Sequence, residues 1–221
     1  MGGIPGTAGM KTALIAGSTG LIGQQLLRLL IESPLYEKVI AITRQDLVAH
    51  PKLTQIKMEF GNITEKSGML KADDVFCCLG TTMAKAGSKE KFRQVDFYYP
   101  YLLAKTTHAA GARQYLLVSS LGANKSSTIF YNEVKGEVEE AVTSVGFDAV
   151  HIFRPSLLLG PRTEKRSGED AAKLFYRIFG FFIPRKYKAV SSLKVANAML
   201  DFATQDKKGT FIHESDELQR F

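Results

Sequence analysis

Runs of hydrophobic residues alternate along this chain with segments whose apolar positions recur at the helical period. The runs are nearly continuous, which is typical of strands buried on both faces of a sheet, and helices between such strands imply parallel connections. We therefore predict a doubly wound α/β fold, with a parallel sheet of about six to seven strands and helices on both faces. The predicted strands are residues 11–20, 37–44, 55–64, 73–82, 114–123 and 148–161, and the predicted helices between them are 21–33, 89–112 and 131–144.

The pattern changes after residue 160. A polar loop is followed by two amphipathic segments, 171–183 and 192–204, and by a last strand, 209–215. This region is too short for a domain of its own, so we expect residues 10–221 to form a single domain in which 161–194 is a small C-terminal cap. Residues 1–9 carry neither charge nor an apolar core, and we interpret them as a leader or cloning remnant outside the fold.

The composition is that of a globular protein, because 45% of the 221 residues are hydrophobic and 23% are charged. No apolar run approaches the ~18 residues that indicate a membrane span, and we expect a cytoplasmic protein. The formal net charge is +7. Nine Lys and Arg residues and three acidic residues fall in 161–194, so this segment alone carries +6. It would suit an anionic ligand, an acidic partner or a solvated face.

The cysteines and histidines predict neither a metal site nor a disulfide. Cys77 and Cys78 are adjacent, which is unfavourable geometry for a disulfide, and they lie in an apolar run. We expect a buried strand end, with a thiol-reactive role as the alternative. The four histidines, at positions 50, 108, 151 and 213, show no metal-ligand spacing, so we expect structural or surface roles for them.

Three regularly spaced glycines follow the first predicted strand. Gly17, Gly20 and Gly23 lie in AGSTGLIG, at the junction between strand and helix. Here Gly17 would permit a tight turn, Gly20 would let a diphosphate approach the backbone, and Gly23 would let the helix pack closely on the strand. The helix N-terminus would offer free N–H groups and a partial positive charge to the phosphates. We predict a Rossmann-type dinucleotide site; the alternative is a glycine-rich turn that binds nothing.

The end of the second strand bears on the choice of cofactor. An acidic residue there would bind the ribose hydroxyls of NAD, whereas a basic residue suits the 2′-phosphate of NADP. The strand ends in Thr43 and Arg44, with Asp46 two residues later. We therefore favour NADP(H) over NAD(H), with Arg44 beside the phosphate and Asp46 as the competing candidate.

Tyr131 and Lys135 are one helical turn apart in YNEVKGEVEEAV and would share a helix face. A tyrosine with its ordinary pKa of ~10 is a poor base at neutral pH. A neighbouring ammonium and an oxidised nicotinamide would favour the phenolate, so that Tyr131 could exchange a proton with a carbonyl or alcohol oxygen. Ser120, at a strand end, is our preferred hydroxyl to hold that oxygen. Three other serines remain alternatives: Ser119, Ser126 and Ser127.

Together these residues resemble the short-chain dehydrogenase/reductase superfamily, and more narrowly its atypical, Tat-interacting-protein-like branch of NAD(P)-binding oxidoreductases. The resemblance covers nearly the whole chain from Lys11 onward and is carried by GSTGLIG, FCCLGTT, VSSLGANKSS, YNEVKGEVE and FRPSLLLGPR. It implies that the glycine turn, the loop after the fourth strand and the FRPSLL segment line the cofactor. Besides the three glycines, it implicates Ser18, Thr19, Leu21, Ile22, Leu79, Gly80, Thr81, Pro155 and Ser156.

Two features depart from the pattern of that superfamily. Many relatives have an asparagine on the fourth helix that supports a proton relay, and here Asp96 stands at the matching place. The gap of eleven residues between Ser120 and Tyr131 is also short. Members of this branch can lose turnover and keep cofactor binding, so two functions are considered.

The first hypothesis is an NADP-dependent oxidoreductase that transfers hydride to or from a small carbonyl or secondary alcohol, with 161–194 covering an anionic substrate. The second is a catalytically weak or inactive NADPH-binding regulatory module that acts through a protein partner. The apolar run 179–184 would suit a homodimer surface. Most aromatic residues of the basic segment look like core or interface residues rather than the interleaved base-stacking aromatics of a recognised nucleic-acid-binding module, so we expect no nucleic-acid partner.

Overall fold

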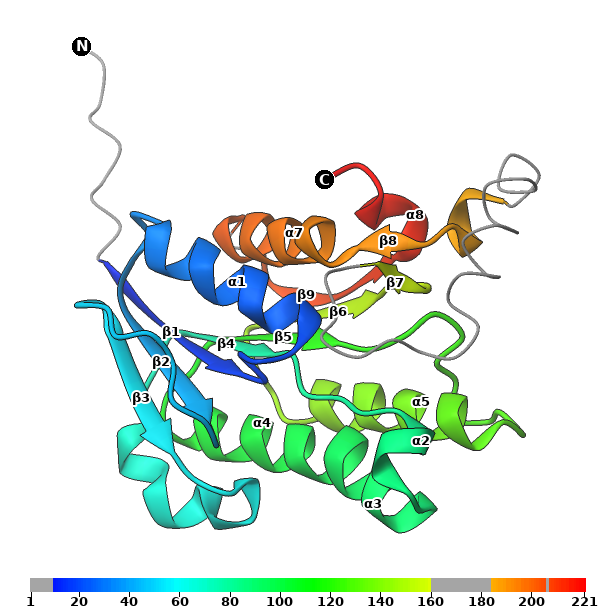
Figure 1. The fold of residues 1–221 in the computed structure, drawn as a ribbon, viewed down its shortest axis with the longest axis horizontal. Coiled ribbons are helices and arrows are strands. Elements are labelled where there is room, and N and C mark those ends of the chain that lie inside the picture. Colours follow the sequence, from blue (N-terminus) through cyan, green and yellow to red (C-terminus); the bar gives the residue numbers. More distant parts are fainter. Residues whose placement is uncertain (1–9, 160–183, 206) are drawn as a thin grey trace.

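The computed structural model describes residues 10–159, 184–205 and 207–221. Its centre is a seven-stranded sheet in the order β3-β2-β1-β4-β5-β6-β9, in which every neighbouring pair is parallel (Figure 1). This confirms the predicted doubly wound α/β fold, with a strand order that reverses between β1 and β4. The strands are β1 (Lys11–Ala16), β2 (Tyr36–Thr43), β3 (Leu53–Lys57), β4 (Asp74–Cys77), β5 (Gln114–Val118), β6 (Ala149–Arg154) and β9 (Gly209–Glu214).

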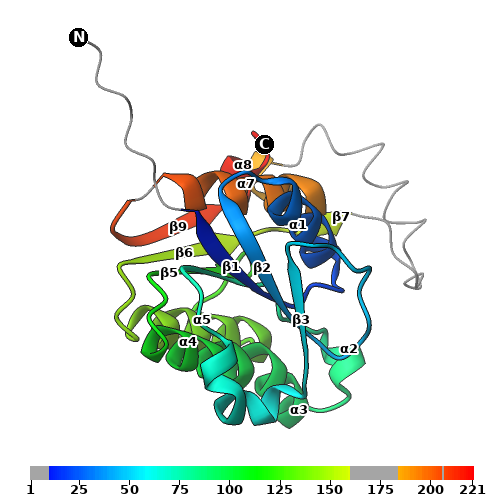
Figure 2. The same ribbon diagram turned by 90° about the vertical axis from the view of Figure 1, so that its left-hand side faces the viewer.

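Helices cover both faces of the sheet, as Figures 1 and 2 show. On one face lie α1 (Leu21–Glu32), α7 (Ser192–Thr204) and α8 (Ser215–Leu218); on the other lie α4 (Tyr99–Ala109), α5 (Phe130–Thr143) and the 3-10 helix η1 (Phe60–Met69). Successive strand residues face opposite layers, so Leu14 packs in the core with α4 and α5 while Ile15 packs in the core with α1 and α7. Apolar side chains are buried on both faces of the sheet, which explains the nearly continuous apolar runs of the strands.

The third predicted strand, residues 55–64, is wrong at both ends. β3 begins at Leu53 and ends at Lys57, and the 3-10 helix η1 follows from Phe60. Phe60 and Ile63 are both buried, and a spacing of three residues puts two side chains on one side of a 3-10 helix. The apolar residues after Lys57 therefore belong to a helical turn against the sheet.

The long helix predicted at 89–112 is present but has two changes of pitch. It comprises α3 (Lys89–Arg93), a π-helical turn η2 (Gln94–Tyr98) and α4. The N–H of Tyr99 donates to the carbonyl of Gln94, five residues earlier. The wide turn lies directly before Pro100, which has no N–H to donate. The helix ends just before Gly111, whose φ of 97° is left-handed, so the predicted end is confirmed.

Small elements complete the carboxyl edge and the C-terminus. A short helix α2 (Met83–Ala86) follows β4, β7 (Leu158–Leu159) pairs with β8 (Val190–Ser191), and the turn η3 (Arg185–Tyr187) precedes β8. The predicted helix 192–204 and strand 209–215 are confirmed as α7 and β9. The predicted helix 171–183, most of the basic cap and the leader 1–9 lie outside the described residues. Among the described helices, none combines the length and apolarity needed to cross a bilayer.

Candidate functional site

The turn between β1 and α1 is built around two very close backbone contacts. Gly17 has a φ of 82°, and a Cβ there would lie 2.5 Å from the carbonyl oxygen of Cys78, at the end of β4. A Cβ on Gly23 would lie 2.0 Å from the carbonyl oxygen of Gly17. Both positions therefore exclude any side chain. This matches the reasons for which the sequence analysis required glycine at these two positions.

Gly20 differs from the other two glycines, because the space beside it is open. A Cβ there would meet only the Gly17 carbonyl oxygen, at 3.4 Å. Gly20 is the N-cap of α1, with no capping side chain and no acidic residue in the first turn. The first backbone donor used inside the helix is that of Gln24, so the N–H groups of residues 21–23 have no intrahelical acceptor. A diphosphate fits this turn, because the helix offers it uncapped N–H groups and a positive dipole end.

The other residues of the turn contribute unequally. Ser18 is buried, and its hydroxyl has no hydrogen-bond partner among the described residues, so it is available to a ligand. Thr19 is exposed, and its carbonyl accepts a hydrogen bond from Gln24. Leu21 is half-buried, while the Ile22 side chain is packed in the core with α1. Ile22 can therefore offer a cofactor only its backbone N–H.

The end of β2 carries an exposed cation beside an ion pair. Arg44 is exposed, and no ion pair joins it to any described residue. Asp46, the competing ligand for a ribose, is paired with Lys57. Lys57 is next to Thr43 in the parallel register of β2 and β3, so a second basic residue lies at this corner of the sheet.

Lys135 is buried near the carboxyl ends of the strands. Its ammonium is 2.7 Å from Oδ1 of Asp96, and it would be 3.7 Å from a Cβ on Gly80. Burial lowers the pKa of Lys135, but the negative charge of Asp96, the electrostatic effect of Tyr131 and the hydrogen bond to Asp96 together raise the pKa by more than burial lowers it. The pKa of this lysine therefore lies above its ordinary value. The predicted Tyr131–Lys135 pair is thus brought next to the loop after β4.

Tyr131 lies in the first turn of α5 and is half-buried. Its ring packs on that of Phe92, with centroids 5.3 Å apart. The loop that leads from Ser120 returns to this turn, because the N–H of Asn124 donates to the carbonyl of Asn132. Gly136 allows the loop to approach, since a Cβ there would lie 2.1 Å from the backbone nitrogen of Lys125.

The four candidate serines have different environments. Ser120 is buried, and its hydroxyl has no partner among the described residues. Ser119 instead donates to Oε1 of Glu139 at 2.5 Å. Ser126 is exposed, and the hydroxyl of Ser127 accepts the N–H of Ile129 within the loop. Of the two buried serines after β5, Ser120 is therefore the one whose hydroxyl is not already bonded.

The remaining residues implied by the resemblance lie at the same edge of the sheet. The N–H of Thr81 donates to Asp96 at 2.8 Å, Leu79 is half-buried and Gly80 is exposed. The carbonyl of Pro155 accepts the N–H of Leu121 at 2.9 Å, so the FRPS segment is bonded to the serine loop. The hydroxyl of Ser156 donates to the carbonyl of Lys188 and accepts from Ser215, so it is not free.

One participant was missed by the sequence analysis. Glu139 is buried on α5 and binds both Ser119 and Arg154, whose guanidinium also contacts Glu214. It follows Tyr131 and Lys135 at the same four-residue interval, so its helical face was readable from the sequence. Its partners are Ser119, directly after β5, and Arg154 at the end of β6, and no local pattern indicates them.

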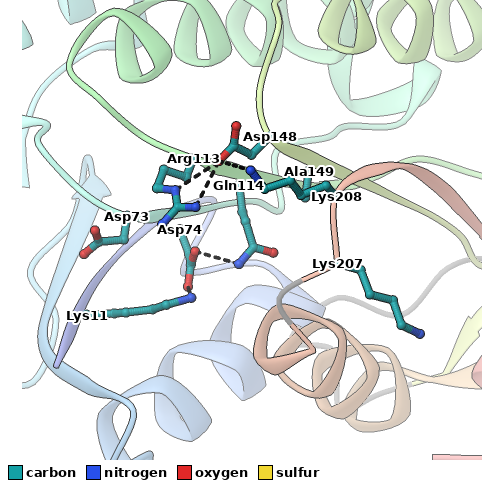
Figure 3. A pocket seen from close by; sticks show the side chains of 9 residues that line it. All are labelled: Lys11, Asp73, Asp74, Arg113, Gln114, Asp148, Ala149, Lys207 and Lys208. Carbon is teal, nitrogen blue, oxygen red and sulfur yellow. Dashed lines mark hydrogen bonds and ion pairs between the residues drawn. The ribbon is translucent and has the colours of Figure 1, made fainter. Parts of the chain in front are cut away.

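Two other clusters lie away from this edge. A pocket at the amino ends of the strands, shown in Figure 3, is built around the buried carboxylate of Asp74, which binds Tyr36, Gln114 and Lys11. His151 and His213 are neighbours on β6 and β9, with ring nitrogens 3.0 Å apart. The described residues contain no group of three or more potential ligands that could hold a metal ion. Cys77 is buried and Cys78 half-buried, and both are free thiols, as expected for a strand end.

Known structures share this fold. The Bordetella bronchiseptica enzyme WbmH, solved in complex with NAD+, superposes with a TM-score of 0.71 over 94% of this chain and 76% of its own, at 16% identity. A short chain dehydrogenase family protein from Francisella tularensis gives a TM-score of 0.66 over 93% of this chain and 97% of its own, also at 16% identity. At such identities the likeness concerns the fold alone.

Sequence comparisons give a closer relationship. Protein HTATIP2 of Rattus norvegicus is 39% identical over 171 residues, which cover 75% of this chain and 70% of the relative. Protein FMP52, mitochondrial, of Candida albicans is 32% identical over 206 residues, which cover 90% of each chain. The model of the NAD dependent epimerase/dehydratase family matches residues 13–179. The chain therefore belongs to the NAD dependent epimerase/dehydratase family, within the short-chain dehydrogenase/reductase superfamily that its sequence resembles.

Proposed function

We propose that this protein is an NADP(H)-dependent oxidoreductase of the short-chain dehydrogenase type, acting on a carbonyl or secondary alcohol. The observation that carries the proposal is the position of Lys135. Its buried ammonium lies between the loop that follows β4 and the first turn of α5, which holds Tyr131. A buried, charged lysine beside a tyrosine is a feature of acid–base sites rather than of structural cores.

Each residue has a separate task in this proposal. The cofactor supplies or accepts hydride at its nicotinamide ring when it is bound. Tyr131 gives a proton to the carbonyl oxygen in reduction and takes it back in oxidation, and the ammonium of Lys135 stabilises the phenolate. The free hydroxyl of Ser120 holds the same substrate oxygen by a hydrogen bond. The phenyl ring of Phe92 excludes water from one side of the phenol.

The preference for NADP over NAD is supported by the charges at the end of β2. Arg44 is exposed there, and a second cation, Lys57, is one strand away. Asp46 is paired with Lys57, so its carboxylate is engaged when a ribose hydroxyl needs an acceptor. A guanidinium binds a phosphate in a bidentate manner, which a ribose hydroxyl cannot reproduce.

Exchange of the charge at position 44 tests the cofactor preference. Titrations of NADPH and NADH into wild-type protein and the Arg44→Asp variant should show tighter NADPH binding in the wild type and a loss of that preference in the variant. Arg28→Asp on the exposed side of α1 is the matched control, because it makes the same charge change away from the turn. The proposal is wrong if the variant keeps the NADPH affinity of the wild type.

The redox step needs its own test. With a panel of carbonyl compounds that includes anionic members, Tyr131→Phe should abolish NADPH oxidation and leave NADPH binding unchanged. If the wild type binds NADPH tightly and oxidises it with no compound of the panel, the protein is instead a cofactor-binding regulatory module that acts through a protein partner. An anionic substrate and a homodimer both follow from the segment 161–194, and they remain predictions.

A further inference from the structure

Asp96 and Lys135 form an ion pair that is almost completely removed from solvent. The side chain of Asp96 is 0% exposed and that of Lys135 is 5% exposed, and their charged atoms are 2.7 Å apart. A lysine buried to this extent without an opposite charge would lose its proton, because burial disfavours the charged form. The pair therefore decides whether an ammonium is present beside Tyr131.

Asp96 also connects three separate elements. It lies in the π-helical turn η2, its Oδ1 binds Lys135 of α5, and its Oδ2 accepts the N–H of Thr81 in the loop after β4. A Cβ on Gly80 would lie 3.4 Å from Oδ1, so the carboxylate is packed against that loop. The wide π turn directs a helical side chain inward at the one place where helix, catalytic lysine and loop meet.

The titratable groups that face Lys135 are few. Asp96 faces it from η2, Tyr131 from its own helix α5 and Cys77 from β4. The buried Cys77 thiol has a pKa raised by its burial, so it is neutral at physiological pH. Nearby, Arg93 of α3 is paired with Glu137 of α5. Asp96 is thus the one described residue that brings a full negative charge to the ammonium at neutral pH.

We propose that Asp96 is a positioning residue that keeps the ammonium of Lys135 charged and fixed beside Gly80. This inference rests on the proposed function, in which that ammonium stabilises the phenolate of Tyr131. An asparagine at position 96 could accept only one of the two hydrogen bonds from Lys135 and Thr81, through its amide oxygen, and would not oppose the buried charge. The acid at this position is therefore a functional feature of this chain, and the substitution of aspartate by asparagine changes the pH range over which the site works.

The test compares Asp96→Asn with Asp96→Glu, which keeps the charge. The control is Asp148→Asn, which removes a carboxylate at the amino ends of the strands, away from Lys135. The pH profile of kcat is measured for each, and the titration of Lys135 is followed by NMR of protein carrying 13C at the lysine Cε. In Asp96→Asn the alkaline limb of the profile and the Lys135 titration should both move to lower pH by roughly one to three pH units. Asp96→Glu should move them less, and Asp148→Asn should leave them unchanged.

A fall in kcat at all pH values with an unmoved limb and an unmoved Lys135 titration would overturn the proposal, because it would indicate a structural role alone. If Asp96→Asn does not fold, the wild-type titration decides: Lys135 should titrate at or above the ~10.4 of free lysine, and a clearly lower value contradicts the proposal. The NMR readout needs no turnover. If Asp96→Asn shifts the Lys135 titration and the wild type oxidises NADPH with no compound of the carbonyl panel, the result would support the role of Asp96 and refute the proposed redox function.

Discussion

Gly23 in the first turn of α1 lies against the carbonyl of Gly17, and a methyl group at position 23 would have to occupy a point 2.0 Å from that oxygen. The contact joins the helix to the strand-to-helix turn directly through the backbone. Neither partner can rotate away, because Gly17 is itself held against the end of β4. The shape of the turn, and with it the proposed phosphate site, therefore depends on the absence of a side chain at Gly23.

Gly23→Ala should accordingly destabilise the protein and remove cofactor binding together. Overpacking against a backbone atom costs about 3 kcal/mol, which for a domain of this size lowers Tm by roughly 6–12 °C. Thermal unfolding and NADPH titration measure both effects. Gly68→Ala in η1 is the control, since nothing lies within 4 Å of a Cβ there. A Gly23→Ala protein that melts like the Gly68→Ala protein would show that the turn tolerates a side chain.

The two adjacent serines that follow β5 should respond to alanine in opposite ways. Ser119→Ala removes a buried hydrogen bond to the Glu139 carboxylate, so it should lower the free energy of unfolding by about 1.5–3 kcal/mol and leave turnover within a few-fold of the wild type. Ser120→Ala removes a hydroxyl that has no partner among the described residues. It should leave stability unchanged and lower kcat by roughly a hundredfold or more.

Urea denaturation and steady-state kinetics on the two variants give the comparison. If Ser119→Ala loses turnover and Ser120→Ala does not, the two serines have the reverse roles. In that case the hydrogen bond to Glu139 belongs to the catalytic state of the site.

The sequence was sufficient where the fold is determined locally. The apolar runs predicted all seven strands of the sheet, six before residue 160 and β9 after it. The run after Lys57, however, was predicted as strand and is helical. Glycine spacing located the β1–α1 turn, because backbone contact at Gly17 and Gly23 excludes every other residue. The Tyr131–Lys135 spacing is a property of one helix and needs no tertiary information.

The interactions that complete the site are between distant segments, and their residues carry no local signal. Asp96, in a π-helical turn, faces Lys135 from another helix, and Glu139 binds Ser119 after β5 and Arg154 of β6. Likewise, His151 and His213 are separated by 62 residues, and only the parallel pairing of β6 with β9 brings them together. Sequence periodicity can assign each residue to a face, but it cannot identify the partner on the next element.

The histidine pair makes the stability of the protein dependent on pH. Burial, and then the nearby charges of His213 and Lys207, lower the pKa of His151 from its ordinary 6.5 to about 4, and burial also lowers that of His213. The unfolded chain therefore binds more protons than the folded chain between pH 6.5 and 4, and stability is lost as the pH falls through this window. At pH 5 the loss from His151 should be about 2 kcal/mol relative to pH 7 or above.

Chemical denaturation of the wild type and of His151→Asn at pH 7 and at pH 5 isolates this contribution, because all carboxylates are common to both proteins. An asparagine amide can still donate to His213 but does not titrate. The variant should lose about 2 kcal/mol less than the wild type between the two pH values. An equal loss in both would show that His151 titrates normally in the folded protein.

The proposed function requires a dinucleotide held at the β1–α1 turn with its reactive ring beside Tyr131 and Lys135. The most direct measurement is a crystal structure of the protein with NADP+. It should show the diphosphate over Gly20 at the N-terminus of α1, the 2′-phosphate at Arg44, and the nicotinamide ribose at the ammonium of Lys135. A nicotinamide remote from Tyr131, or a turn between β1 and α1 that holds no phosphate, would contradict it.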